Sequence, residues 1–232
     1  MTTKGEYIRG DNGYLSRAAQ RGLFELPERR EFLVRHVGPP PRRVLDLGCA
    51  GGDVAVMLTR LGYQVTGVEM NRRMAEEARR RGIEVVEHDL DEPLPLPDGC
   101  ADAVHACEVI EHLFDTEGFL REVRRLLVPG GVLILSTPNL NSLDNRGRVL
   151  FGLPAPMWGA WPGDVHGGHI RVFNKRKIVE LLQRTGFAVE RIAGMNDSRA
   201  AAPLSRLPTL SRMLLIKAVK AGGQGEVQQR PP

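Results

Sequence analysis

Cysteines, aromatic residues and long apolar runs are all scarce in this chain of 232 residues. Its three cysteines, Cys49, Cys100 and Cys107, are scattered without CxxC spacing, which indicates reduced thiols and a cytoplasmic protein. No apolar run approaches the roughly 18 residues of a membrane span, and no apolar leader stands near the N-terminus, so we expect neither a membrane span nor export. Aromatic residues make up 5% of the chain, too few to suggest a surface that stacks nucleic-acid bases.

The rest of the composition fits one α/β domain. The net charge of +4 comes mostly from arginines, several of which cluster in residues 72–81. Such a run is typical of a solvated helix face, so nucleic acid is not an expected partner. No internal repeat is present, and we expect a single domain over residues 1–220, with a lid in residues 1–25 and a disordered tail in residues 221–232. Nothing in the sequence indicates the oligomeric state.

The most informative stretch is VLDLGCAGGD, residues 44–53. Its apolar start predicts a buried strand, and Gly48, Gly51 and Gly52 permit a turn that a Cβ would obstruct. Helical apolar periodicity begins directly after this turn. A pyrophosphate-binding turn has G-x-G-x-x-G spacing, which this stretch lacks, and Asp46 would repel a pyrophosphate while suiting a ligand ammonium group. A nicotinamide dinucleotide is therefore disfavoured.

Two further predicted strands also end at polar residues. Residues 63–70 predict a strand that ends near Glu69, where a carboxylate can accept hydrogen bonds from both ribose hydroxyls. Residues 83–90 predict the next strand, with Asp89 and Leu90 at its end. Strands and helices then continue to alternate, which predicts a parallel sheet with right-handed crossovers and a binding crevice at the carboxyl ends of its strands.

In these motifs the chain resembles the class I S-adenosylmethionine (SAM) methyltransferases, whose first motif is an acidic residue followed by a small-residue turn. The resemblance, over about residues 41–220, implies an α/β Rossmann-like, doubly wound fold. Its sheet would be mostly parallel and seven-stranded, in the order 3-2-1-4-5-7-6 with strand 7 antiparallel, helices on both faces and an insertion after strand 5. It also implies SAM as the cofactor, with Asp89 at the adenine amino group and the Leu90 backbone at a ring nitrogen. Ala50 stands where the family often has a glycine. The cofactor-binding residues expected from these motifs are Asp46, Gly48, Cys49, Ala50, Gly51, Glu69, Met70, Asp89, Leu90 and Cys107.

The alternation stops after the fifth predicted strand, and residues 139–173 are expected to form a substrate-cap insertion. We expect a helix over residues 141–151 and, over residues 152–168, a loop that closes over the acceptor. Both tryptophans, Trp158 and Trp161, lie in this loop, where they either line the acceptor pocket or pack the insertion onto the sheet.

The end of the chain predicts two strands, residues 188–195 and 213–220, and the resemblance implies that they form an antiparallel hairpin. A basic amphipathic helix over residues 211–220, lying on a membrane or a partner, is the alternative.

A candidate catalytic cluster follows the predicted fourth strand. If a regular helix begins near Glu108, then Glu108, Glu111 and His112 share one face at helical spacing. This E-x-x-E-H pattern resembles that of the ubiquinone-pathway O-methyltransferases and of small-RNA 2′-O-methyltransferases, both of which bind a divalent ion through it. By the same resemblance, His169 is comparable to a further histidine ligand of the RNA enzymes. A metal site of Glu108, Glu111, His112 and His169 would suit Mg²⁺, Mn²⁺, Fe²⁺ or Zn²⁺.

Two interpretations without a metal stay open. In one, the three motif residues are structural and hydrogen-bond their neighbours or the cofactor. In the other, His112 or His169 is a general base, because methyl transfer from a sulfonium requires alignment of the acceptor and removal of one proton. Glu108, His112 and His169 are therefore the candidate catalytic residues. Arg171 would either hold an anionic group of the acceptor or pair with an acidic residue of the motif.

The sequence thus predicts an enzyme, a SAM-dependent methyltransferase that methylates a hydroxyl oxygen of a small-molecule or glycan-like acceptor. An RNA 2′-O-methyltransferase and a SAM-binding protein without turnover are the two alternatives.

Overall fold

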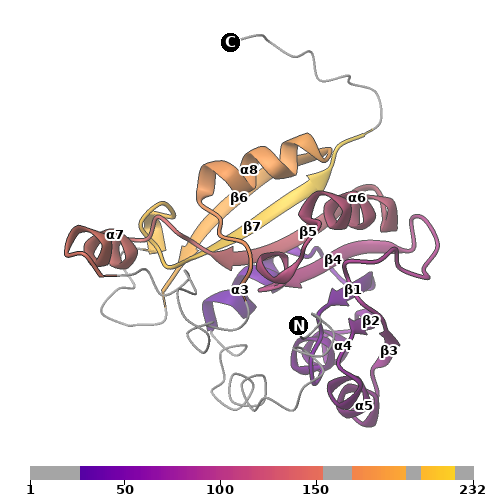
Figure 1. Cartoon of the computed structure of the whole chain (residues 1–232). Coiled ribbons are helices and arrows are strands. Elements are labelled where there is room, and N and C mark those ends of the chain that lie inside the picture. The colour runs from indigo at the N-terminus through magenta and orange to yellow at the C-terminus, as the bar shows by residue number, and fades with distance from the viewer. Residues whose placement is uncertain (1–26, 154–168, 197–204, 223–232) are drawn as a thin grey trace.

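The computed structural model describes residues 27–153, 169–196 and 205–222 (Figure 1). The lid expected in residues 1–25, both tryptophans of the insertion and residues 223–232 of the expected tail lie outside the described residues. A single seven-stranded sheet organises the described part of the chain. Its strands are β1 (Arg43–Leu47), β2 (Gln64–Glu69), β3 (Glu84–Glu87), β4 (Ala101–Cys107), β5 (Leu127–Pro138), β6 (Phe187–Met195) and β7 (Met213–Lys220).

The strands lie in the order β3-β2-β1-β4-β5-β7-β6. Strands β1 to β5 pair in parallel, whereas β7 is antiparallel to both of its neighbours, β5 and β6. The expected sheet order and the antiparallel last strand are therefore confirmed. Since β7 pairs along its length, the alternative of an amphipathic helix over residues 211–220 is wrong.

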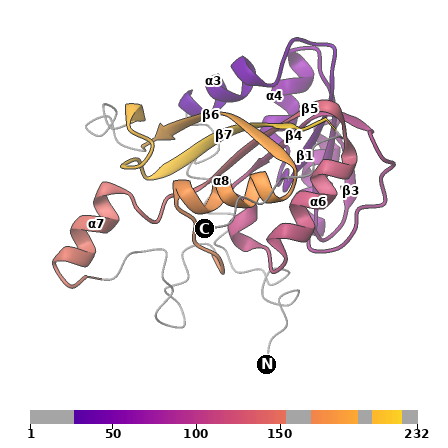
Figure 2. The ribbon, with the colours of Figure 1, turned by 90° about the horizontal axis from the view of Figure 1, so that it is seen from above.

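Helices cover both faces of the sheet, as Figure 2 shows. Three helices pack on one face and two on the other, while the short η2 and the projecting α7 lie near the carboxyl end of β5. The first group is α3 (Pro27–His36), α4 (Asp53–Arg60) and α5 (Arg72–Arg80), and the second is α6 (Thr116–Leu126) and α8 (Lys175–Arg184). The remaining two are η2 (Ile110–His112) and α7 (Leu143–Leu150). None of the described helices is long and apolar enough to cross a membrane.

The core has one layer on each face of the sheet because side chains of a strand alternate between its faces. In β5, Leu133 packs with α6 residues such as Leu120, whereas the adjacent Ile134 packs with Phe32 of α3. Each of these leucine and isoleucine side chains is almost fully buried, which contributes about 1.5–3 kcal/mol apiece. The central strands are therefore a rigid support for the loops at their ends.

Helix α4 begins directly after the glycine-rich turn without a side-chain cap, whereas asparagine, aspartate or serine side chains cap α5, α6, α7 and α8. Asn71, Asp115, Ser142 and Asn174 each accept a hydrogen bond from the backbone N–H three residues later.

Parallel strands place their carboxyl ends at the same sheet edge, and the register sets Asp46 of β1 beside His105 of β4. The sequence motifs therefore converge at this edge.

Candidate active site

The chain turns sharply after β1 and after β4, and both turns contain a residue in the left-handed backbone region. Ala50 has a φ of 47° and Glu108 a φ of 56°, and they are the non-glycine residues with positive φ in the described part of the chain. At Gly48, with a φ of 73°, a Cβ would come within 2.8 Å of Val109 Cγ2, so the two turns are in close contact. Such conformations cost about 1–3 kcal/mol at non-glycine residues and cluster at binding and catalytic sites.

Beneath these turns lies a buried pair of polar side chains, Asp46 from β1 and His105 from β4. The His105 Nδ1 to Asp46 Oδ1 distance is 2.7 Å, and both residues are buried. The second oxygen, Asp46 Oδ2, is buried without a hydrogen-bond partner among the described residues. A buried carboxylate oxygen without a donor is costly, so this oxygen marks a place where a ligand donor would be stabilising.

Cys107 also belongs to this buried polar region. Burial acts against a charged imidazole, but Cys107 and Asp46 outweigh it and raise the pKa of His105 to about 10. In return, although burial opposes ionisation, His105 lowers the pKa of the Cys107 thiol. The polar groups at the end of β4 are therefore electrostatically coupled to Asp46.

Glu69 fixes the glycine turn to the end of β2. Its Oε2 accepts the Ala50 N–H at 3.0 Å, and its Oε1 accepts the Asn71 N–H at 2.7 Å. Burial raises the pKa of Glu69, while these two backbone donors act in the opposite direction. Each carboxylate oxygen has a second lone pair, so Glu69 can hold the turn and still accept hydrogen bonds from a ligand.

The other predicted cofactor residues lie around the same edge. Strand β3 ends at Glu87, earlier than expected, so Asp89 and Leu90 lie in the following turn, where Asp89 Oδ1 accepts the Asp91 N–H at 3.0 Å. Met70 is half-buried after β2. The Cys49 side chain is buried in an apolar cluster with residues of α4 and α5, so a cofactor contact from this residue would come from its backbone.

Glu108 lies in a polar environment that the sequence analysis missed. Its Oε1 accepts a hydrogen bond from Ser136 Oγ at 2.6 Å and lies 3.6 Å from the guanidinium of Arg29, a buried residue of α3. Burial raises the pKa of Glu108, while Arg29 and Ser136 oppose this rise. A histidine within the apolar run of β4 was the available signal for this buried region, since His105 stands between Val104 and Ala106.

A second cluster joins Glu111, His112 and His169. One potential ligand atom from each lies within 4.8 Å of the others. The two imidazole rings meet edge to face with centroids 4.8 Å apart, and His169 Nε2 lies 4.0 Å from Glu111 Oε1. The post-insertion segment is brought here by Ile170 and Arg171, whose N–H groups donate to the Glu111 carbonyl at 2.9 and 3.0 Å.

Glu111 is almost completely excluded from solvent. Burial and the nearby Glu108 carboxylate raise its pKa well above the ordinary value. Thr137 Oγ1 donates to Glu111 Oε2 at 3.2 Å, whereas Glu111 Oε1 has no hydrogen-bond partner among the described residues. A cation placed between this oxygen and the two histidines would therefore compensate a buried carboxylate.

Two details of the predicted cluster differ from the structure. The expected regular helix from Glu108 is wrong, because the left-handed conformation of Glu108 delays the helix and only the 3₁₀ turn η2 forms. Glu108 is consequently drawn toward Ser136 and does not belong to the close group of Glu111, His112 and His169. Arg171 donates to the Phe114 carbonyl at 2.9 Å, and within the described ranges no ion pair joins it to either glutamate.

The sheet order and the turn after β1 are those of the class I SAM-dependent methyltransferase fold, and this family implies SAM as the cofactor. The chain belongs to a methyltransferase family, since the sequence model described as "Methyltransferase domain" matches residues 15–192.

Relatives agree with this assignment. The chain is 33% identical, over 70% of its length, to a probable S-adenosylmethionine-dependent methyltransferase of Mycolicibacterium smegmatis, of which it spans only 58%. It is 34% identical, over 80% of its length and 79% of the relative, to the ubiquinone biosynthesis O-methyltransferase of Chromobacterium violaceum.

Among solved structures, a SAM-dependent methyltransferase of Thermotoga maritima, named as a possible histamine N-methyltransferase, matches with a TM-score of 0.71. The match covers 94% of this chain and 100% of that one at 22% identity, a level at which it shows the fold alone.

Proposed function

We propose that this chain is a SAM-dependent O-methyltransferase that methylates a hydroxyl of a small-molecule or glycan-like acceptor. The observation that carries the proposal is the cluster of Glu111, His112 and His169, which lies beside the turn after β4. One buried carboxylate oxygen of the cluster, Glu111 Oε1, has no hydrogen-bond partner among the described residues. A hydroxyl acceptor loses a proton during methyl transfer, and this cluster combines the groups that can receive it.

The predicted cofactor residues fit SAM chemically. Asp46 Oδ2 is a buried acceptor for the ammonium group, and Glu69 has lone pairs left for the two ribose hydroxyls. Residues 48–51 would bring backbone close to the amino-acid part, while Asp89 and Leu90 would bind the adenine. SAM supplies an electrophilic methyl group on its sulfonium. The residues of this chain hold it at the carboxyl ends of β1 and β4, where the acceptor must align with that methyl.

Proton removal at the acceptor oxygen is assigned to His112 or His169. The Glu111 carboxylate is held by Thr137 and lies 4.0 Å from His169 Nε2, where a negative charge would stabilise a protonated imidazole. Glu108, a candidate catalytic residue from the sequence, is held by Ser136 and Arg29, so we place it in the wall of the site. Glu111, His112 and His169 would also hold a divalent ion, which would acidify a bound hydroxyl.

Exposed apolar residues close to the cluster in the sequence would favour an acceptor with an apolar part. Phe114 and Ile170 lie next to the cluster in the chain and are 56% and 40% exposed. Apolar side chains around a few convergent polar groups are typical of small-molecule pockets. The O-methyltransferase relative of Chromobacterium violaceum supports a hydroxyl as the methylated group. Against RNA, aromatic residues that could stack on bases make up only 5% of the chain.

The direct test is transfer of a radiolabelled methyl group from SAM to a catechol, a simple phenol, a sugar and a short RNA. Glu111→Gln and His169→Asn should lower transfer by about 10²–10⁴-fold while SAM affinity stays within a few fold. His36→Gln is the control, because it removes an imidazole of α3 that lies outside the cluster. Methyl transfer to RNA alone would establish the first alternative, an RNA methyltransferase. SAM binding without transfer to any of these acceptors would establish a binding protein.

The metal contribution is tested separately. If the cluster binds Mn²⁺ or Zn²⁺, calorimetry should detect a site in the wild type that Glu111→Gln and His169→Asn lose, with cofactor binding intact. A chelator-treated enzyme with full activity would contradict a catalytic metal and leave His112 or His169 as the proton acceptor.

A further inference from the structure

The opposite edge of the sheet carries a cavity that the methyltransferase reaction does not use. It has a volume of about 460 Å³ and lies where β4 and β5 begin, since Gly99 and Leu127 line it. The carboxyl ends of these strands, with the catalytic cluster, are at the other end of the sheet. A ligand in this cavity would therefore bind away from the cofactor.

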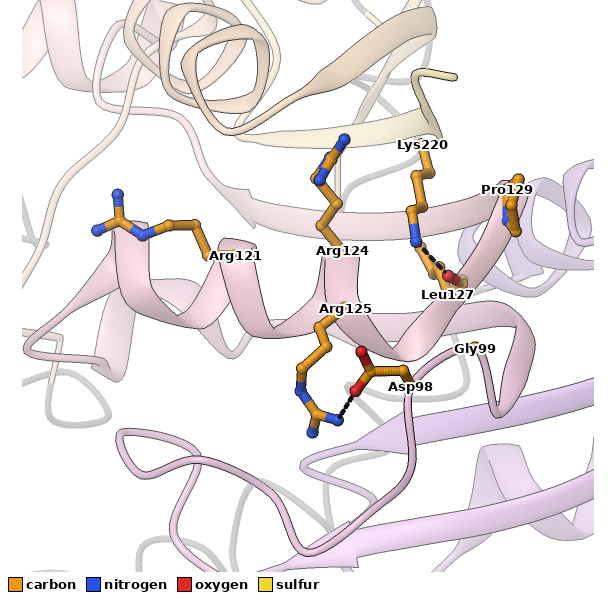
Figure 3. A pocket seen from close by; sticks show the side chains of 8 residues that line it. All are labelled: Asp98, Gly99, Arg121, Arg124, Arg125, Leu127, Pro129 and Lys220. Atoms are coloured by element: carbon orange, nitrogen blue, oxygen red, sulfur yellow. Dashed lines mark hydrogen bonds and ion pairs between the residues drawn. The ribbon is translucent and has the colours of Figure 1, made fainter. Parts of the chain in front are cut away.

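Cationic side chains dominate the lining of the cavity (Figure 3). Arg121, Arg124, Arg125 and Lys220 all contribute, against the single carboxylate of Asp98. That carboxylate is already engaged, since Arg125 lies 2.6 Å from Asp98. Arg125 and Arg121 each have a further acidic partner on α6, Glu122 and Glu117.

Arg124 and Lys220 are the two cations that remain without a compensating acid among the described residues. Arg124 lines the cavity while its Nε is buried beside Gly186, and Lys220 Nζ donates at 2.6 Å to a neutral acceptor, the Leu127 carbonyl. Figure 3 shows Arg125 turned toward Asp98, while Arg124 points the other way, to the side on which Lys220 lies.

Burial and the neighbouring cationic side chain change the pKa of Lys220. Burial, and after it the neighbouring Arg124, lower the pKa of Lys220, and Asp98 opposes them. Two cations that repel each other in one hollow are stabilised by an anion placed between them. Arginine in particular presents a fork of donors that matches the oxygens of a phosphate.

We propose that this cavity, built around Arg124 and Lys220, is a second binding site that takes a phosphate group. A phosphate monoester or pyrophosphate group would accept hydrogen bonds from the terminal guanidinium nitrogens of Arg124 and from the remaining protons of the Lys220 ammonium group. This proposal does not depend on the identity of the methyl acceptor.

The test is calorimetric titration of inorganic pyrophosphate into the full-length protein at physiological salt. We expect a dissociation constant below about 1 mM for the wild type and at least a tenfold increase for Arg124→Gln and for Lys220→Gln, since each removes a charge-assisted hydrogen bond. The pyrophosphate affinity of Arg124→Lys should lie between those of the wild type and Arg124→Gln, because lysine keeps the charge and lacks the forked donors of a guanidinium group. Arg72→Gln, which removes an exposed charge from α5, is the matched control and should bind like the wild type.

Two further measurements complete the design. S-adenosylhomocysteine affinity should be unchanged by saturating pyrophosphate, and competition between them would overturn the proposal by placing the anion in the cofactor site. Sedimentation with vesicles that contain phosphatidic acid distinguishes a lipid headgroup from a free phosphate as the source. Equal binding by the wild type, Arg124→Gln and Arg72→Gln, or no binding of either probe, would also overturn it. Melting temperatures of all variants identify any that fail to fold.

Discussion

Replacement of Asp46 by asparagine should separate the recognition of the cofactor's ammonium group from the rest of cofactor binding. The side chain keeps its shape, and its Oδ1 can still accept the His105 Nδ1–H that is 2.7 Å from Asp46 Oδ1 in the structure. What disappears is the negative charge on the buried Oδ2, which has no donor among the described residues. A hydrogen bond to a charged group contributes about 1.5–3 kcal/mol, which corresponds to a roughly 10- to 100-fold loss of affinity.

The assay compares two ligands by calorimetry. S-adenosylhomocysteine carries the ammonium group, whereas 5′-methylthioadenosine lacks the amino-acid part and keeps the adenine and ribose. Asp46→Asn should weaken the first about 10- to 100-fold and leave the second within twofold. An equal loss for both ligands would mean a general disruption of the turn, and no loss for either would refute the assignment of Asp46 to the ammonium group.

His105→Gln provides the complementary perturbation. It removes the imidazole that now holds Asp46, so a buried carboxylate would lose its only charged partner in the described part of the chain. Breaking a buried pair in this way costs about 3–5 kcal/mol, so this variant should unfold at a clearly lower temperature than the wild type. An unchanged melting temperature would contradict a structural role for His105.

The other predictions concern the turn and the stability of the fold. Glu69→Gln should weaken the binding of S-adenosylhomocysteine and of 5′-methylthioadenosine alike, by at least tenfold in calorimetry. Both ligands carry the ribose, and the group that accepts the Ala50 N–H would no longer be charged. Gly67→Ala should lower the melting temperature, since the new Cβ would lie 2.5 Å from Cys49 Sγ in the core; an unchanged melting temperature would contradict this packing. Glu122→Gln should cost about 1 kcal/mol at pH 7. Its hydrogen bond with an arginine lowers the pKa of Glu122, so that contribution is present above the unfolded pKa and is lost as pH falls through the folded one; urea unfolding of both proteins should converge in acid.

The fold could be predicted from the sequence because its signals are local and repeated. Apolar periodicity and turn residues located the strands to within a few residues, as in the confirmed β6 and β7. Strand β2 likewise ends at Glu69, close to the expected position. Local patterns of this kind survive folding because each is satisfied within its own strand, turn or helix.

The buried partners were harder to predict because they depend on contacts between distant parts of the chain. Arg29 and Glu108 are far apart in the sequence, and so are Asp46 and His105, so spacing alone could not pair them. The helical periodicity expected after β4 failed for a related reason. A left-handed Glu108 is unfavourable by itself. Its backbone N–H donates to the Ser136 carbonyl, and its side chain contacts Ser136 and Arg29, so tertiary interactions hold it there.

The two ends of the insertion after β5 meet in the folded domain, which has a consequence for how the insertion can vary. Asn139 and Phe173 form a parallel bridge, and the Leu140 N–H donates to the Phe173 carbonyl. The Ile170 N–H donates to the Glu111 carbonyl. These backbone hydrogen bonds close the base of the insertion. The entropic cost of closing the loop therefore changes only slowly with the length of the segment between its two ends. A segment of another length or sequence could therefore stand between residues 140 and 169 while these hydrogen bonds keep His169 beside Glu111.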